Sequence, residues 1–152
     1  MLSVVIPARD ESENLPDCIG EIVYTLTNEH IVYELLIIDD GSTDGTERVI
    51  AQLKSQFPCV RYIRNQGENG FGRAVRLGLR EFQGDAVAIM MADRSDSPKD
   101  LVLYWQTLQN GNECAFGSRF IVGSKIHNYP KLKLIAKRIV NNIIRYAFRI
   151  EY

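Results

Sequence analysis

Residues 34–46 read ELLIIDDGSTDGT, a short apolar run that ends in two acids and a polar turn. Such a run, bounded by turn-forming residues, is typical of a strand buried on both faces. Residues 2–7 form a second apolar run, and residues 12–26 between the two carry an early proline and apolar residues at helical spacing. Together the three segments predict one β-α-β unit with parallel strands.

The same alternation continues along the chain. Further helices are expected over residues 43–56, 72–82 and 98–110, and further strands over residues 60–64, 86–92 and 113–117. The resulting five short strands and four helices predict an α/β fold, with a mostly parallel sheet and helices on both faces. Ligands of such sheets bind beyond the carboxyl ends of the strands. No repeat or linker divides the sequence, so a single domain over residues 1–152 is expected.

Composition argues against several classes of protein. Of the 152 residues 45% are apolar and 24% are charged, which suits a globular domain with a core and not a disordered chain. Three widely spaced cysteines and two histidines argue against a disulfide scaffold or a zinc module. The longest strongly apolar run, residues 86–92, is far short of the roughly 20 residues that span a bilayer, and no signal peptide is recognisable. A soluble, cytoplasmic protein is therefore expected.

Charge is distributed unevenly. The net charge is −1, but residues 119–152 hold eight basic residues and one acid, while the rest of the chain is strongly acidic. A basic C-terminal segment predicts an anionic partner, such as a phosphate or a lipid headgroup, or else a solvated helix face. Apolar residues at helical spacing within it also suit a helix that lies on an anionic membrane. Base-reading and stacking side chains are too sparse for nucleic acid to be expected.

Two acids, Asp39 and Asp40, follow the predicted strand 34–39. Because side chains alternate along a strand, the two must face opposite ways, so that one can face a ligand while the other supports the loop. An acid at this edge can accept hydrogen bonds from a base or from ribose hydroxyls. The alternative is an ordinary turn and helix cap built by residues 42–44.

Residues 67–74, GENGFGRA, open a predicted helix but match neither a dinucleotide fingerprint nor a P-loop. Their glycines indicate a close approach to another loop or to a ligand. Asp93 and Asp96 follow the predicted strand 86–92, where a hard divalent ion that carries a diphosphate would sit. For Asp96 the alternative is the cap of the helix that begins at Pro98.

Five motifs in order resemble the inverting family 2 glycosyltransferases, within them the dolichyl- or polyprenyl-phosphate mannosyltransferase and glucosyltransferase branch. They are VVIPARDE, DDGSTDGT, NGFGRA, ADRSDSP and GSRF. The resemblance covers nearly the whole chain and implies the GT-A fold, a nucleotide-diphospho-sugar transferase fold. It also implies a Mg²⁺ or Mn²⁺ cofactor.

The resemblance assigns roles to individual residues. The nucleotide-binding residues it implies are Pro7, Arg9, Glu11, Ile38, Asp40, Gly70, Gly72 and Ala92. Asp93 and Ser95 fall where the family holds the metal and the diphosphate, and Arg119 and Arg138 fall where basic side chains bind donor or acceptor phosphates. The catalytic residues expected are Asp93, Asp96, Arg119 and Arg138, with Asp96 the candidate base if the acceptor is a hydroxyl.

The sequence departs from the family pattern at three points. Met91 stands where most members have the first aspartate of the D-x-D motif, so one metal carboxylate is lost. Glu68 stands where some members carry a basic residue. Members normally continue well past this length, so the chain is expected to be a GT-A catalytic domain truncated at its C-terminal end.

The expected function is inverting transfer of mannose or glucose from a GDP- or UDP-sugar to a polyprenyl or dolichyl phosphate. The basic C-terminal segment would hold the enzyme peripherally at the cytoplasmic face of a membrane. A hydroxyl acceptor and a nucleotide-sugar-binding homologue without turnover are the alternatives. A phosphoacceptor signalling domain is disfavoured, because Asn65 and Ser118-Arg119 stand where it needs an aspartate and a lysine.

Overall fold

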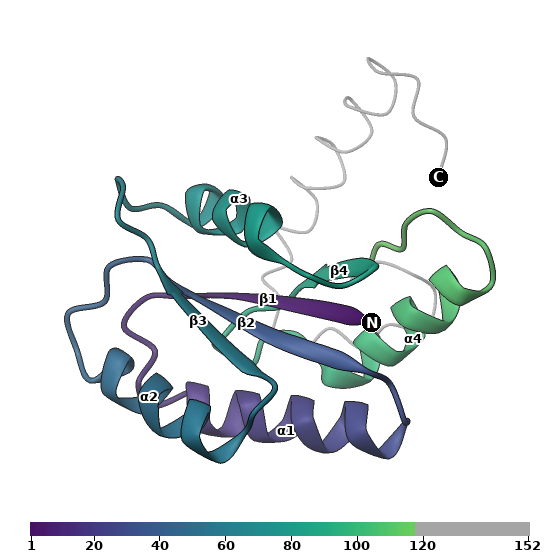
Figure 1. The fold of residues 1–152 in the computed structure, drawn as a ribbon, viewed down its shortest axis with the longest axis horizontal. Helices are drawn as coiled ribbons and strands as arrows, with labels where there is room; N and C mark the ends of the chain where they lie inside the picture. The colour runs from purple at the N-terminus through teal and green to yellow at the C-terminus, as the bar shows by residue number, and fades with distance from the viewer. Residues whose placement is uncertain (118–152) are drawn as a thin grey trace, which may run out of the picture. The chain divides into compact units, whose positions relative to one another are not determined.

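The computed structural model describes residues 1–117, of which Met1–Phe116 form one compact unit. Strands and helices alternate along this unit (Figure 1). They are β1 (Leu2–Ala8), α1 (Leu15–Asn28), β2 (Tyr33–Asp39), α2 (Thr46–Gln56), β3 (Val60–Arg64), α3 (Phe71–Glu81), β4 (Ala86–Ile89) and α4 (Pro98–Gln109). The predicted single domain over residues 1–152 stays a prediction, because residues 118–152 lie outside the described range.

The strands form one parallel sheet in the order β3-β2-β1-β4. The two central strands, β1 and β2, pair along their whole length, from Leu2 opposite Tyr33 to Ala8 opposite Asp39. Because both are covered on two sides, nearly every one of their residues is buried. The prediction of a parallel α/β sheet is confirmed, and the carboxyl ends of β1, β2 and β3 lie in register at one edge.

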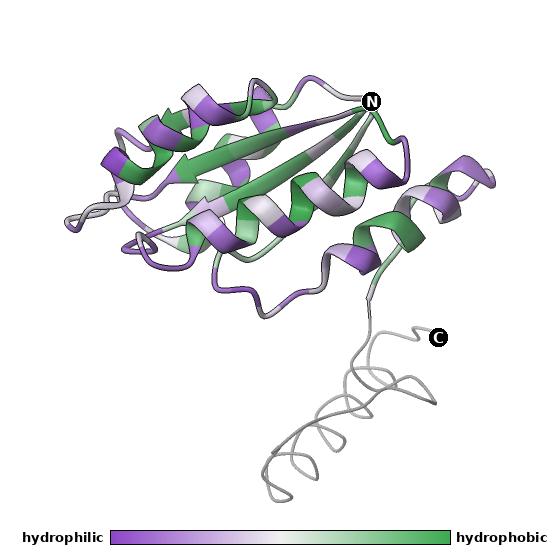
Figure 2. Ribbon diagram, turned by 90° about the horizontal axis from the view of Figure 1, so that it is seen from below, coloured by the Kyte–Doolittle hydropathy of each residue, from purple (hydrophilic) through white to green (hydrophobic). Residues whose placement is uncertain are grey.

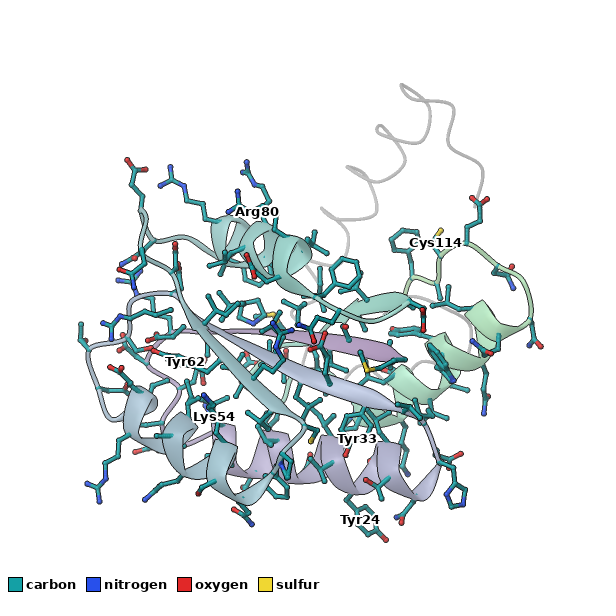
Figure 3. The ribbon with its side chains drawn as sticks, in the orientation of Figure 1. Tyr24, Tyr33, Lys54, Tyr62, Arg80 and Cys114 are labelled. Atoms are coloured by element: carbon teal, nitrogen blue, oxygen red, sulfur yellow. The ribbon has the colours of Figure 1, made fainter. Side chains whose placement is uncertain are left out.

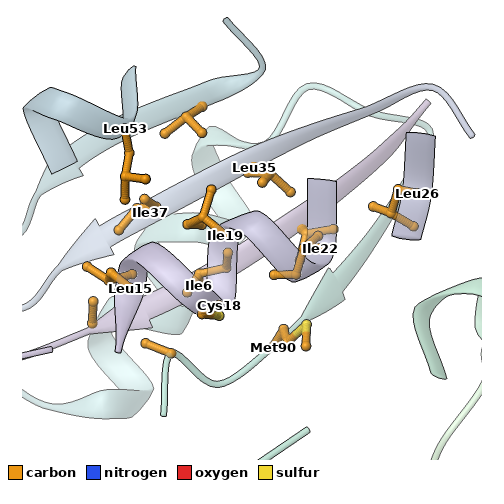
Figure 4. Packing of buried hydrophobic residues seen from close by; sticks show 14 of the residues in the cluster. Ile6, Leu15, Cys18, Ile19, Ile22, Leu26, Leu35, Ile37, Leu53 and Met90 are labelled. Atoms are coloured by element: carbon orange, nitrogen blue, oxygen red, sulfur yellow. The ribbon is translucent and has the colours of Figure 1, made fainter. Parts of the chain in front are cut away.

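Alternation along the central strands divides the core into two layers. Val4, Ile6, Leu35 and Ile37 pack with α1, α2 and α4 (Figure 4), whereas Val5, Leu36 and Ile38 pack with Ala74 of α3 on the other face. Figure 1 shows α1 and α2 under the sheet and α3 above it. Helices therefore cover both faces, as predicted.

Helix α1 supplies the largest apolar stripe of the first layer. Leu15, Ile19, Ile22 and Leu26 are spaced by three or four residues and fully buried, and each contributes about 1.5–3 kcal/mol by leaving water. In Figure 2 the strands are largely green, whereas the loops beyond their arrowheads run from white to purple. The apolar sequence thus builds the sheet and the polar sequence is left for its carboxyl edge. No helix within residues 1–117 is long and apolar enough to cross a membrane.

Two predictions for the last two strands are wrong, the existence of a strand at residues 113–117 and the end of β4. Residues 113–117 are not a strand, and Phe116 among them is 86% exposed. Strand β4 ends at Ile89 instead of residue 92: the Met90 N–H still donates to the Val5 carbonyl of β1 at 3.0 Å, and the Met91 N–H then donates to the Asp96 carboxylate at 3.0 Å within the turn. A strand needs a partner edge as well as apolar residues, and a local sequence pattern does not report that edge.

Helix α2 begins at Thr46, three residues later than predicted. The N–H groups of Thr43 and Asp44 donate to the Asp10 carboxylate, and so they belong to a loop contact and not to a first helical turn. A contact between loops that are distant in sequence therefore sets the start of this helix.

Gly78 lies where α3 crosses β1, and a Cβ at this position would meet Cγ1 of Val5 at 2.3 Å. Val5 is fully buried and β-branched, so it can rotate little to make room. Gly78→Ala is expected to lower the free energy of unfolding by about 1–3 kcal/mol, measured by urea denaturation.

Gly20→Ala on α1 is the matched control, because a Cβ there meets no described atom within 4 Å. The free energy of unfolding of this variant should stay the same or rise by up to about 1 kcal/mol. Equal stability of the two alanine variants would contradict the close packing of α3 on β1.

Candidate functional site

The candidate site is the edge of the sheet where the strands end. The segments that follow β1, β2, β3 and β4 are residues 9–14, 40–45, 65–70 and 90–97. Since neighbouring parallel strands end in register, the first three segments meet there, and hydrogen bonds between them follow. This is the end at which parallel sheets bind their ligands.

Asp39 and Asp40 point to opposite faces and do different work. Asp39 is fully buried, its Oδ1 accepts the Ser42 N–H at 2.8 Å, and the hydroxyl of Tyr62 (labelled in Figure 3) lies 3.4 Å from Oδ2. Burial and the Asp39 charge raise the pKa of Tyr62, so the phenol stays a proton donor. Asp39 therefore supports the turn after β2, which confirms that one of the two acids has this role.

Asp40 is 4% exposed and both of its carboxylate oxygens hold the glycine loop, residues 65–70. Oδ1 accepts the Asn65 side-chain amide at 2.7 Å, and Oδ2 accepts the Gly70 N–H at 2.6 Å. The sequence reasoning did not foresee these two bonds. Their only sequence signal was the glycine pattern itself, which indicated a close approach.

That close approach is confirmed at Gly70, and Gly41 in the turn after β2 lies on the other side of the same contact. A Cβ at Gly41, whose φ is +77°, would lie 2.8 Å from the Asn69 side chain. Gly70, with φ +150°, is the residue whose N–H reaches Asp40. Glycine is needed at both positions, because residues with a side chain rarely adopt these φ values. At Gly41 a side chain would also collide with Asn69. A Cβ at Gly72 meets no described atom within 4 Å, so the same packing argument does not extend to it.

Asp10 joins the loop after β1 to the loop after β2. It has φ +55°, and its Oδ1 accepts the Thr43 N–H at 2.7 Å while its own N–H donates to the Ser42 hydroxyl at 3.0 Å. The Glu11 N–H donates to the Thr46 hydroxyl at 2.9 Å. Sequence reasoning missed Asp10, because its partners lie more than 30 residues away.

The predicted cap of α2 is only partly correct. The N-cap residue is Gly45, and Asp44 instead accepts the Thr46 N–H at 2.9 Å. Hydrogen bonds from Ser12 and Thr46 hold the pKa of Asp44 well below its usual range. The residues predicted as a turn and cap therefore do stabilise this loop, although none of residues 42–44 is the N-cap.

The predicted nucleotide-binding residues of β1, β2 and the loop after β1 lie at the carboxyl edge of the sheet. Pro7 and Ile38 are buried and lie opposite each other in the β1–β2 ladder, and Arg9 is exposed just beyond β1. Glu11 is half-buried and its carboxylate accepts the Asn14 side-chain amide at 2.7 Å. Ala92, after β4, is 1% exposed.

Asp93 and Ser95 are exposed in the segment after β4, where Asp93 Oδ1 accepts the Ser95 N–H at 2.9 Å. Asp96 accepts the Met91 N–H and is not the cap of α4; that cap is Ser97, which accepts the Lys99 N–H at 3.3 Å. The capping alternative for Asp96 is therefore wrong.

No group of three or more His, Cys, Asp or Glu side chains within residues 1–117 could hold a metal ion. Cys18 lies beside the segment after β4, with its sulfur 3.7 Å from the Met91 carbonyl. Burial raises the pKa of Cys18 to about 12, so it remains a thiol at neutral pH and not a metal-binding thiolate. Arg119 and Arg138 lie outside the described residues.

Solved structures share this fold. The mannosyltransferase PcManGT of Pyrobaculum calidifontis, solved with GDP-Man and Mn²⁺, aligns with a TM-score of 0.53 and 22% identity over 60% of this chain and 27% of that one. Glucosyl-3-phosphoglycerate synthase of Mycobacterium tuberculosis, solved with UDP, aligns with a TM-score of 0.59 and 22% identity over 74% and 41% of the two chains. The parallel sheet with its loop-lined edge is the GT-A glycosyltransferase fold.

The family follows from sequence. Residues 3–151 match Glycosyl transferase family 2, and the chain belongs to that family. Dolichol-phosphate mannosyltransferase of Pyrococcus furiosus is 36% identical over 137 residues, which are 90% of this chain and 38% of the relative. Polyprenol monophosphomannose synthase of Mycolicibacterium smegmatis is 32% identical over 149 residues, 94% and 54% of the two chains. The chain thus spans between about two-fifths and about half of these relatives.

Asp40→Asn tests the glycine-loop contact. An asparagine has an NH2 group in place of one of the two accepting oxygens, so either the Asn65 amide or the Gly70 N–H, both half-buried, loses its partner. The free energy of unfolding should fall by about 1–3 kcal/mol, and the Gly70 amide should exchange with solvent faster, as measured by urea denaturation and NMR-detected hydrogen exchange.

Asp85→Asn is the matched control, because Asp85 is an exposed acid that pairs with the N-terminal amine at the opposite end of the sheet. It should leave exchange at Gly70 unchanged. Unaltered exchange in Asp40→Asn would mean that Asp40 does not hold this loop.

Proposed function

We propose that this protein transfers mannose or glucose from a GDP- or UDP-sugar to a polyprenyl or dolichyl phosphate, with inversion at the anomeric carbon. The observation that carries the proposal is the similarity to two relatives named for polyprenyl- or dolichol-phosphate mannose synthesis, over 90% and 94% of this chain. Membership of glycosyltransferase family 2 and the loop-lined edge of the sheet support it.

The nucleoside is proposed to bind at the carboxyl ends of β1 and β2. Pro7 and Ile38 offer an apolar floor, since they lie opposite each other in the ladder, and Arg9 and Glu11 would line the pocket beside them. Asp40 would act in part through the glycine loop that it holds, with Gly70 at the end of that loop and Gly72 in the first turn of α3. Ala92 would border the diphosphate.

A divalent cation fits Asp93 in one particular way. Asp93 is exposed. Of its two carboxylate oxygens, Oδ1 accepts the Ser95 N–H, and no described residue donates to Oδ2. Mg²⁺ and Mn²⁺ bind through one or two carboxylates when phosphate oxygens and water complete the octahedron. Asp93 with Ser95 can therefore hold the cation of a nucleoside diphosphate, which when bound neutralises charge that develops on the leaving diphosphate.

A lipid-phosphate acceptor is already anionic, so it needs positioning and charge neutralisation more than a general base. Arg119 and Arg138 of the basic C-terminal segment are proposed for this role, and the same segment for peripheral contact with the cytoplasmic face of a membrane. For a hydroxyl acceptor Asp96 stays the candidate base, because the Met91 N–H donates to its Oδ2 and leaves Oδ1 without a hydrogen bond among the described residues.

A second candidate is a nucleotide-sugar-binding homologue without turnover. Met91 stands where the family pattern has a carboxylate, and no larger group of metal-ligating side chains occurs within residues 1–117. Binding and transfer therefore have to be measured separately.

Binding of GDP and of UDP to the full chain is measured by calorimetry with and without Mn²⁺, for the wild type and for Asp93→Ala, with Asp85→Ala as control. One nucleotide should bind in an Mn²⁺-dependent way, and Asp93→Ala should weaken it by at least about tenfold, since it removes the protein carboxylate on the cation. Binding of neither nucleotide, or equal binding by Asp93→Ala, would contradict the proposed site.

Transfer is measured with labelled GDP-mannose and UDP-glucose, each offered with polyprenyl phosphate in vesicles and with a sugar hydroxyl acceptor. Labelled polyprenyl-phosphate sugar is the expected product. Transfer to the hydroxyl acceptor alone would overturn the lipid-phosphate assignment. Metal-dependent binding with no transfer to either acceptor would favour the binding homologue.

A further inference from the structure

Arg94 links the segment after β4 to helix α1. Its guanidinium Nη1 donates to Asp17 Oδ2 at 2.9 Å, and its Nη2 donates to Glu21 Oε1. Asp17 and Glu21 are four residues apart on α1, so they lie on one face of the helix and both meet the same fork of donors. These two contacts form the Arg94 clamp.

The clamped segment contains the proposed cation ligand. Arg94 directly follows Asp93 and has φ +61°, a left-handed conformation that is unfavourable for an arginine. Two further bonds shape the same turn, from the Ser95 N–H to Asp93 and from the Met91 N–H to Asp96. All the atoms of these two bonds belong to the turn itself, so they do not tie it to the rest of the molecule.

Among the described residues the clamp is the main polar contact between this turn and α1. The Cys18 thiol also lies 3.7 Å from the Met91 carbonyl, and Ala92 is buried in the core cluster that α1 helps to form. Cys18 itself is buried and uncharged, whereas Arg94 brings a charged group to two carboxylates. Removing the clamp therefore loosens the exposed residues 93–95, whereas Ala92 stays anchored in the core.

We propose that Arg94, through Asp17 and Glu21, is a positioning residue that holds the Asp93 carboxylate where it can share a divalent cation with a nucleoside diphosphate. This inference rests on the proposed function. Within residues 1–117 no group of three or more His, Cys, Asp or Glu side chains could hold a cation. A cation would therefore depend on one carboxylate, whose position has to be accurate, and the clamp restrains that position.

Exposed ion pairs contribute little to global stability. Arg94 is 41% exposed and its two partners are more exposed still. The clamp should consequently have little effect on unfolding and a measurable effect on the turn and on cation-dependent binding. A purely structural pair would not divide its effects in this way.

A rival role for Arg94 is direct contact with the diphosphate after release from Asp17 and Glu21. The two roles predict opposite behaviour of the α1 partners. If the clamp positions Asp93, neutralising Asp17 and Glu21 weakens binding; if Arg94 binds diphosphate itself, neutralising them frees it and leaves binding unchanged or tighter.

The test is a double-mutant cycle in the full chain. Arg94→Gln is one arm, the pair Asp17→Asn with Glu21→Gln is the other, and the triple variant closes the cycle. Affinity for GDP and UDP is measured by calorimetry with and without Mn²⁺. Each arm should weaken Mn²⁺-dependent binding by about three- to tenfold, the triple variant should be no weaker than either arm, and binding without Mn²⁺ should not change.

A second measurement needs no ligand. NMR-detected hydrogen exchange of the Met91 and Ser95 amides should become faster in both arms, because these amides donate within the clamped turn. Asp85→Asn, which removes the exposed ion pair at the opposite end of the sheet, should alter neither exchange nor affinity. Arg94→Lys should restore binding only in part, since one ammonium cannot reproduce the two-pronged contact.

Three results would overturn the clamp: unchanged amide exchange in both arms, additive losses in the triple variant, or full affinity in the Asp17 and Glu21 variant beside a weakened Arg94→Gln. Failure of the proposed function gives a different result, a wild type that binds neither nucleotide. Amide exchange still decides whether the clamp holds the turn in that case.

Discussion

Backbone N–H groups in the loops that follow β2, β3 and β4 need acceptors, and carboxylates supply them. Asp39 accepts the Ser42 N–H, Asp40 accepts the Gly70 N–H, and Asp96 accepts the Met91 N–H. A buried N–H without a partner costs about 1–3 kcal/mol, so these loops can be close to the core only because the acids accept from them. The shape of the candidate site depends on this requirement.

The same requirement limits the chemistry that the acids can perform. A carboxylate that accepts a hydrogen bond on each oxygen, as Asp40 does from the Asn65 side-chain amide and the Gly70 N–H, has little capacity left for a metal. Asp93 differs, since it is exposed and accepts a single hydrogen bond from the described residues, from the Ser95 N–H to Oδ1. The acidic character of this edge is thus mainly structural, and the role of cation ligand is proposed for Asp93 with Ser95.

Much of the fold could be predicted from local pattern. The helix over Leu15–Asn28 and the strand over Tyr33–Asp39 were expected from their apolar residues. Apolar residues at helical spacing are buried together on one face of a helix, and a short continuous apolar run is buried as a strand. The strand expected at residues 113–117 and the late end of β4 were wrong, because pairing depends on an edge contributed by distant residues. The residues of the candidate site were located by motif, whereas the bonds of Asp10, Asp40 and Arg94 across 25 or more residues were not.

The sequence by itself determined the alternation of strands and helices, the two apolar faces of the central strands and the polar loops at their carboxyl ends. Those features follow from side-chain periodicity and turn chemistry, which act over a few residues. Only the tertiary structure decided which acid supports which loop and that Arg94 meets Asp17 and Glu21. Hydrogen bonds and ion pairs form between whatever groups the folded sheet brings within about 3 Å, and that distance is a property of the register and not of the local sequence.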